Sequence, residues 1–286
     1  MSLNTILRES LRRLQRSGEQ SVFLSEASIA QINVLKNSQK DAQASAVTKA
    51  VEVAAKPEVV AKPQVASLTS NAQLNSINNL KLKGSKEAQI ETLNASFKSL
   101  FPQLKFALGS GALKAKLVFV SELPSADELS LEQLFVGEPG ALLDKILKAM
   151  GISRSEVYTT TLFKSPKMAS TGMNRTNSNT ESRSIAVEYL KKELAVIQPV
   201  ITIILGTSTY SHLLPSPETE DSFSKNRGKV LSYEGFEIIP TFHPAYLLLK
   251  NCLETKRLFW EDMMHVMQKL GLPISHQQKA YFLSKS

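Results

Sequence analysis

The chain has 286 residues, of which 42% are hydrophobic, and its 34 lysines and arginines against 26 acidic residues give a formal net charge of +8. This length suffices for one core of ordinary domain size plus a substantial extension, and the charge favours polyanions such as nucleic acid or an acidic membrane surface. A single cysteine, Cys252, excludes an internal disulfide and any multi-cysteine zinc or iron–sulfur site.

The chain shows no membrane or secretion signal. No run approaches the roughly 18 apolar residues of a membrane span. The N-terminus lacks an apolar core followed by a cleavage site. We therefore expect a cytoplasmic protein that does not associate with a membrane. We also expect it to be monomeric.

The first 36 residues are expected to form an amphipathic helical segment. Within residues 2–17, leucines and isoleucine recur at helical spacing and arginines lie mostly on the other face: Leu3, Ile6, Leu7, Leu11 and Leu14 against Arg8, Arg12, Arg13 and Arg16. One interpretation is a solvated helix that packs on a protein partner. The other is direct contact with DNA phosphates or a membrane.

Residues 37–95 are expected to form a low-complexity, largely disordered linker, which would make the N-terminal part of the chain an arm. Residues 37–85 are rich in Ala, Ser, Gln, Asn, Lys and Val, include Pro57 and Pro63, and contain no aromatic residue. Such a segment buries too little surface to fold alone. Removal of residues 1–95 is therefore expected to leave a folded domain over 96–275, followed by a C-terminal tail, 276–286.

Strand-like and helix-like runs alternate within residues 96–275. Strands are expected at 116–121, 157–163, 200–206 and 236–243, and helices at 140–150, 181–197 and 253–270. This alternation predicts an α/β fold, a three-layer sandwich with a central, mainly parallel sheet. Ligands of such sheets gather outside the carboxyl ends of the strands, which here means Glu122, Thr161, Gly206 and His243. A polar loop, 164–180, is expected to be mobile and functional.

Four stretches carry a resemblance to a known family. They are Ser121–Ser125 (SELPS), Phe135–Asp144 (FVGEPGALLD), Val157–Lys164 (VYTTTLFK) and His243–Leu248 (HPAYLL). In this order they resemble motifs of the uracil-DNA glycosylase superfamily, most closely its bacterial family-four branch. The strongest is His-Pro-Ala-Tyr-Leu-Leu after a strand, preceded by Arg227-Gly228 and followed by Trp260. The resemblance covers roughly residues 114–271 and implies a uracil-DNA-glycosylase-like fold with DNA as the partner.

The resemblance also implies roles for individual residues. His243 would donate a hydrogen bond to the base oxygen that gains charge as the glycosidic bond breaks. Glu122 would orient water, although solvation or capping of the following helix are alternatives. The substrate-binding positions would be Phe135, which stacks on the flipped base, Thr161 at the base-reading position, and Ser121, Leu123, Pro124 and Ser125. The DNA-binding positions would be Lys164, Asn174, Arg175, Arg227, Pro244, Ala245, Tyr246, Leu247, Leu248, Leu249 and Lys250, with the leucines acting as a wedge.

Several positions depart from the family pattern. Family-four proteins hold a four-iron cluster with four cysteines, but Ser165 stands where one is expected, so we expect no cofactor and no metal. Thr161 replaces the uracil-reading Asn, and one hydroxyl cannot present an amide's paired donor and acceptor. Leu123 stands where other branches have a water-activating Asp, and Ser121 and Ser125 replace glycines.

Two functions are consistent with this sequence. The first is a divergent DNA glycosylase that hydrolyses the N-glycosidic bond of uracil or another deaminated base during base excision repair. The alternative is a non-catalytic DNA-binding protein on the same fold, acting as an accessory or scaffold. Thr161, Leu123 and the altered glycines favour lost or changed base specificity, and excision assays would distinguish the two functions.

Overall fold

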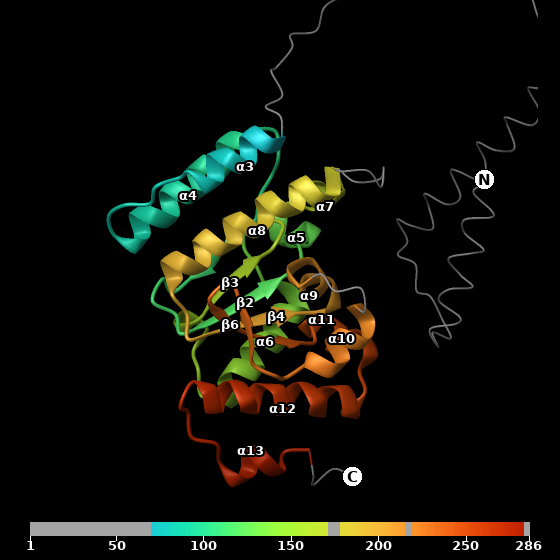
Figure 1. Cartoon of the computed structure of the whole chain (residues 1–286). Helices are drawn as coiled ribbons and strands as arrows, with labels where there is room; N and C mark the ends of the chain where they lie inside the picture. The colour runs from blue at the N-terminus through green and yellow to red at the C-terminus, as the bar shows by residue number, and fades with distance from the viewer. Residues whose placement is uncertain (1–69, 171–177, 215–218, 283–286) are drawn as a thin grey trace, which may run out of the picture. The chain divides into compact units, whose positions relative to one another are not determined.

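A six-stranded sheet forms the centre of the computed structural model, which describes residues 70–170, 178–214 and 219–282 (Figure 1). The strands are β1 (Ser110–Gly111), β2 (Leu117–Ser121), β3 (Tyr158–Thr161), β4 (Ile201–Leu205), β5 (Leu231–Tyr233) and β6 (Phe236–Thr241), in the order β1-β3-β2-β4-β6-β5. β3, β2, β4 and β6 run parallel, and the short edge strands β1 and β5 pair antiparallel. The predicted α/β architecture with a mainly parallel sheet is confirmed.

Helices cover both faces of this sheet. They are α3 (Ser70–Asn78), α4 (Lys86–Leu100), α5 (Ala126–Leu131), α6 (Gly137–Met150), the 3-10 turn η1 (Arg154–Glu156), α7 (Pro166–Ser170), α8 (Ser178–Ile197), α9 (Thr207–Leu213), α10 (Thr219–Asn226), α11 (Pro244–Lys250), α12 (Leu253–Lys269) and α13 (His276–Ala280). The three helices expected from the sequence correspond to α6, α8 and α12. α4 has 15 residues and was not predicted, because most of it falls within the expected linker. The remaining helices were not predicted because fewer than three turns give little periodicity.

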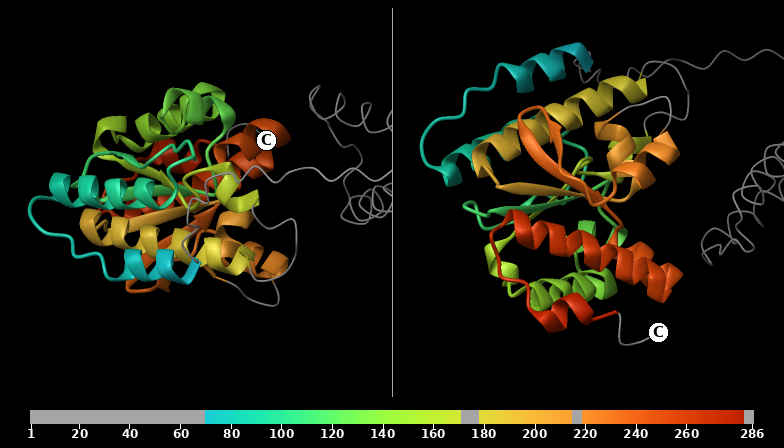
Figure 2. Two further views of the ribbon diagram at one scale, coloured as in Figure 1. Left: turned by 90° about the horizontal axis from the view of Figure 1, so that it is seen from above. Right: turned by 60° about the horizontal axis from the view of Figure 1, so that its bottom comes forward.

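Alternating side chains of each strand build two cores. Val118 and Val120 of β2 face the cluster formed with α3, α4 and α8, whereas Leu117 and Phe119 face the cluster formed with α6 and α12. β2 and β4 are buried along their whole length, which explains their continuous apolar runs. Figure 2 shows α8 with α3 and α4 on one side of the sheet, and α12 with α6 on the other.

The expected linker boundary at residue 95 is wrong, because residues 70–95 belong to the folded domain. α3 packs on α8 through Ile77, and α4 buries Ile90, Leu93 and Phe97 in the same core. The linker was predicted because residues 37–85 contain no aromatic residue. Within residues 70–95 the packing is supplied by aliphatic side chains at helical spacing instead. The expectations for residues 1–69, including the amphipathic helix at 2–17, lie outside the described residues.

The expected tail boundary at residue 276 is also wrong for the described part of the C-terminus. α13 is bound to the domain by two hydrogen bonds of Gln278. Its main-chain carbonyl accepts from Trp260 Nε1 at 2.9 Å, and its side-chain amide donates to the Ala149 carbonyl at 2.7 Å. Among the described residues, no helix is both long and apolar enough to cross a membrane.

Candidate active site

The carboxyl ends of the parallel strands bring three motifs together. β2 ends at Ser121 and β3 at Thr161, and these two residues are paired in register. Both side chains project to the α6 face, because they alternate with Val120 and Thr160. Gly206 follows β4, and a Cβ atom placed there would lie 3.8 Å from His243 Cβ. Ser121, Thr161, Gly206 and His243 therefore lie along one edge of the sheet.

His243 caps the N-terminus of α11, and this fixes its tautomer. Its Nδ1 atom accepts a hydrogen bond from the Ala245 backbone N–H at 3.1 Å. An accepting Nδ1 is unprotonated, so the neutral ring carries its proton on Nε2. Burial lowers the pKa of His243 below its ordinary value, against an opposing effect of Glu128. The fold thus holds His243 as a neutral imidazole with an Nε2–H donor.

An NMR pH titration tests this protonation state. Because burial disfavours the imidazolium ion, the pKa of His243 should fall below the ordinary histidine value of about 6.5. At pH 7 the ring should show the Nε2–H tautomer. The spectrum of a His243→Asn variant assigns the resonance. A pKa above the ordinary value, or a proton on Nδ1 at pH 7, would contradict this assignment.

Phe135 faces His243 across the site. The two rings are nearly parallel, with an interplanar angle of 20° and centroids 5.9 Å apart. Phe135 has a left-handed backbone conformation with φ of 54°, which is uncommon for an aromatic residue. Glu128 stabilises it by accepting a hydrogen bond from the Phe135 backbone N–H. A Cβ atom at position 140 would lie 1.8 Å from the Phe135 carbonyl oxygen, so only Gly140 permits this loop geometry.

Thr161 is completely buried at the end of β3. Its Oγ1 atom has no hydrogen-bond partner among the described residues. A buried hydroxyl without a partner is costly, since its lost hydration is not replaced. A polar ligand at this edge of the sheet would supply the missing partner.

Glu122 lies next to a histidine that the sequence analysis did not identify. Glu122 Oε1 is 3.4 Å from His212 Nε2, and the His212 ring stands edge-on to Phe163 with centroids 5.1 Å apart. Both members of the Glu122–His212 pair are partly exposed. The alternative that Glu122 caps the following helix is wrong, because Ser125 caps α5 by accepting from the Glu128 N–H.

Lys164 cannot contact DNA as predicted, because it is fully buried beneath the site. Its ammonium group donates to Glu193 Oε2 at 2.8 Å, to the Thr161 carbonyl oxygen at 2.7 Å and to the Thr160 hydroxyl. Glu193 also accepts from Thr160 Oγ1 at 2.8 Å and from the Tyr158 hydroxyl at 2.9 Å. All three donors of the ammonium group are used internally, so none remains for a phosphate.

Two further predicted DNA contacts are also corrected. Leu247 is 2% exposed and packs in the α6–α12 core, so it is not part of a wedge. Arg227 Nη1 donates to both carboxylate oxygens of Asp262 at 2.6 Å and to the Leu258 carbonyl at 2.9 Å. Arg227 therefore joins the end of α10 to α12. Both residues have structural roles.

The rest of α11 divides into a buried and an exposed side. Pro244 is buried and Leu248 is half-buried, whereas Leu249 is 73% exposed. The other exposed residues of this helix are Ala245, Tyr246 and Lys250. Leu249 is thus the leucine best placed to act as a wedge. Asn174 and Arg175 lie outside the described residues.

An iron–sulfur cluster does not fit this chain. Four thiolates are needed for a four-iron cluster, and the sequence contains one cysteine. Cys252 is exposed and caps α12, where its sulfur accepts from the Thr255 N–H. Ser165 is buried at the start of α7. Within the described ranges no group of three or more His, Cys, Asp or Glu residues could hold a metal ion.

Sequence reasoning missed Glu128, His212 and Gly140. A signal for Glu128 was present, because Ser125-Ala126-Asp127-Glu128 is a capping-box pattern, and this box is formed in the structure. No sequence pattern near His212 indicated its role, because His212 on α9 and Glu122 after β2 are far apart in the sequence and meet only in the folded chain. Leu123 is half-buried in the core with α8, and Pro124 is buried, so both shape the loop after β2.

Comparison with known proteins agrees with this arrangement. The family model of the uracil DNA glycosylase superfamily matches residues 108–264. The Type-4 uracil-DNA glycosylase of Thermotoga maritima is 32% identical over 157 residues, which cover 54% of this chain and 78% of that protein. The corresponding proteins of Sulfurisphaera tokodaii and Saccharolobus solfataricus are 29% and 30% identical, over 61% and 57% of this chain and 79% and 75% of theirs.

This chain belongs to the uracil-DNA glycosylase superfamily. The similarity to Type-4 members confirms the family assigned from the four motifs. This chain has one cysteine and so lacks the cysteines for a four-iron cluster.

Proposed function

We propose that this chain is a DNA glycosylase that removes uracil or another deaminated base from DNA. The observation that carries the proposal is His243, a neutral ring whose Nδ1 is occupied by the Ala245 N–H and whose Nε2–H is left as a donor. Relatives that are named Type-4 uracil-DNA glycosylases support the same class of reaction. Phe135, nearly parallel to the His243 ring, is the aromatic residue on which a flipped base would stack. It is 7% exposed and Arg154 Cζ lies 5.5 Å from its ring centroid, so stacking requires the neighbouring side chains to move.

The proposed reaction is hydrolysis of the bond between the base nitrogen and C1′ of the sugar. The base leaves with the electron pair of that bond, and a water oxygen forms the new bond to C1′. The Nε2–H of His243 donates to the base oxygen that gains negative charge, as a donor in an oxyanion hole does. Glu122 orients the water and accepts its proton, which ends on the released base. His212, 3.4 Å from Glu122, holds that carboxylate in place.

A specific observation supports the second candidate, a non-catalytic DNA-binding protein. Thr161 stands at the base-reading position but is 0% exposed, so a base would reach its hydroxyl only after the neighbouring side chains move. A hydroxyl also offers fewer hydrogen bonds than an amide. Loss of base reading would leave a protein that binds DNA through the exposed face of α11.

Excision assays on duplexes carrying uracil, hypoxanthine or xanthine test both functions. We expect the wild type to release at least one of these bases. Thr161→Asn should raise uracil excision on the order of tenfold or more, because the amide supplies the paired donor and acceptor. Thr161→Val is the matched control, since it keeps the branched shape and removes the hydroxyl. If neither wild type nor Thr161→Asn releases a base while both are folded and bind DNA, the non-catalytic function is correct.

A further inference from the structure

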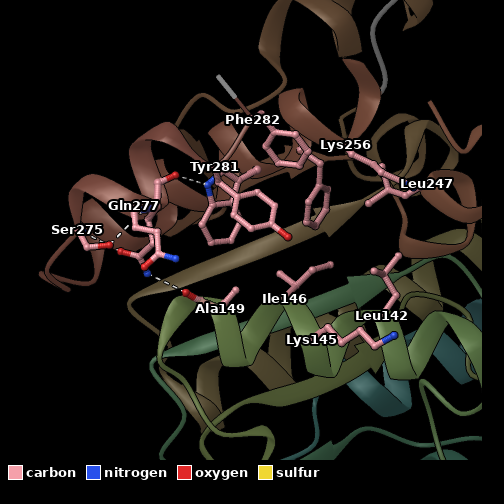
Figure 3. A pocket seen from close by; sticks show the side chains of 13 residues that line it. Leu142, Lys145, Ile146, Ala149, Leu247, Lys256, Ser275, Gln277, Tyr281 and Phe282 are labelled. Atoms are coloured by element: carbon pink, nitrogen blue, oxygen red, sulfur yellow. Dashed lines mark hydrogen bonds between the residues drawn. The ribbon is translucent and has the colours of Figure 1, made fainter. Parts of the chain in front are cut away.

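A second site lies between α6, α11, α12 and α13. A cavity of about 540 Å³, which is the size of a typical ligand site, is lined mainly by Leu142, Ile146, Leu247, Phe259, Trp260 and Tyr281 (Figure 3). Neither His243, Phe135 nor Thr161 lines it. The proposed glycosylase reaction therefore does not account for this cavity.

Defined hydrogen bonds hold the outer wall of the cavity. α13 begins with a capping box between Ser275 and Gln278, so the helix start is fixed. Gln278 accepts from Trp260 Nε1 on α12 and donates to the Ala149 carbonyl on α6. The wall is thereby joined to both neighbouring helices, and Figure 3 shows Tyr281 and Phe282 facing Leu142 and Ile146 across the cavity.

The charged groups at the cavity have one sign. Lys145 on α6 and Lys256 on α12 both line it, and no acidic residue does so among the described residues. These two lysines come from opposite walls (Figure 3). Lys256 Nζ also donates to Asn251 Oδ1 at 2.6 Å, which uses one of its three N–H donors. An occupant that neutralises both ammonium charges needs at least two negative charges together with an apolar group that fills the space between the aromatic side chains.

We propose that this cavity is a docking site for an acidic peptide segment of a partner protein. An aromatic or aliphatic side chain of the segment enters between Trp260 and Ile146, and its carboxylates pair with Lys145 and Lys256. Residues 2–17 of this chain have the wrong charge for the site, because they carry Arg8, Arg12, Arg13 and Arg16. The phosphates of DNA could pair with the two lysines, but no apolar group of DNA lies beside the phosphates, so the apolar part of the cavity would stay unfilled.

The single tryptophan of the chain provides the measurement, because Trp260 lines the cavity. The full-length protein is titrated with the synthetic peptide Asp-Asp-Glu-Leu-Phe, which does not absorb where tryptophan is excited. We expect a saturable change in Trp260 fluorescence. The uncharged peptide Asn-Asn-Gln-Leu-Phe and the acidic peptide Asp-Asp-Glu-Ser-Ser should each bind at least about tenfold more weakly, which corresponds to about 1.4 kcal/mol.

Matched variants on α6 localise the binding. Lys145→Glu should weaken binding of Asp-Asp-Glu-Leu-Phe about tenfold or more. Lys148→Glu changes the same charge at an exposed position of the same helix that does not line the cavity, and should change affinity by less than about twofold.

Three results would overturn the proposal. The first is the absence of a saturable change, and the second is equal binding of the uncharged or the Ser-Ser peptide. The third is an equal effect of Lys145→Glu and Lys148→Glu. A short DNA duplex that alters Trp260 fluorescence in a Lys145-dependent manner would instead assign the cavity to nucleic acid. Because binding is measured directly, these results do not depend on base excision.

Discussion

Replacing His243 with alanine is expected to lower base excision on the order of 10²-fold or more while leaving DNA affinity nearly unchanged. The Nε2–H of His243 would act mainly on charge that develops as the glycosidic bond breaks, so its loss raises the barrier more than it weakens substrate binding. Single-turnover excision on a uracil-containing duplex gives the rate, and fluorescence anisotropy on the same duplex gives the affinity.

Two controls separate this role from a structural one. His243→Asn keeps a side chain that can cap α11 and donate a hydrogen bond, so it should recover part of the lost rate. His276→Ala removes an exposed histidine on α13 and should leave the rate unchanged. Equal loss of rate and affinity in His243→Ala, or full recovery of the rate with His243→Asn, would indicate that His243 only supports α11.

Removing residues 1–95 is expected to unfold the domain, contrary to the sequence-based expectation. The deletion takes away the buried side chains Ile77, Ile90 and Leu93 and leaves Phe97 without its helix. Full burial of one such side chain contributes roughly 1.5–3 kcal/mol. Their combined loss is comparable with a whole domain stability of about 5–15 kcal/mol. Denaturant unfolding followed by circular dichroism would show no cooperative transition.

The matched deletion ends before α3. Removing residues 1–69 leaves every contact among the described residues in place, so the unfolding midpoint should stay close to that of the full chain. The same cooperative transition after both deletions would mean that α3 and α4 contribute nothing to stability. Unfolding after both would mean that the first 69 residues are needed for folding.

The four parallel strands were predictable, and β2 and β4 most clearly, because these two are nearly continuous apolar runs buried between the two layers of helices. β2 and β4 are each five residues long and wholly buried, so their sequences, LVFVS and ITIIL, carry a strong local signal. The ends of β3 and β6 then located Thr161 and His243 at the carboxyl edge of the sheet. Order along the chain and the rule for parallel sheets were sufficient for that part of the site.

The burial of Lys164 could not be predicted in the same way. A lysine that follows a strand and precedes a polar loop is normally solvated, and its partner Glu193 lies 29 residues later on α8. Only the packing of α8 over β3 brings the two side chains together. The Glu122–His212 pair has the same origin, since its members come from the ends of β2 and α9. Pairs of this kind depend on the tertiary structure and leave no local pattern.

Lys164 holds the main chain at the end of β3, because its ammonium group donates to the Thr161 carbonyl oxygen at 2.7 Å. The same ammonium group of Lys164 donates to Glu193 Oε2, which fixes its position. The hydrogen bond to position 161 involves only its main-chain carbonyl and no side-chain atom of that residue. A substitution at position 161 is therefore expected to leave β3 in place, and under the proposed function it would change which base is excised without disturbing the strand that carries it.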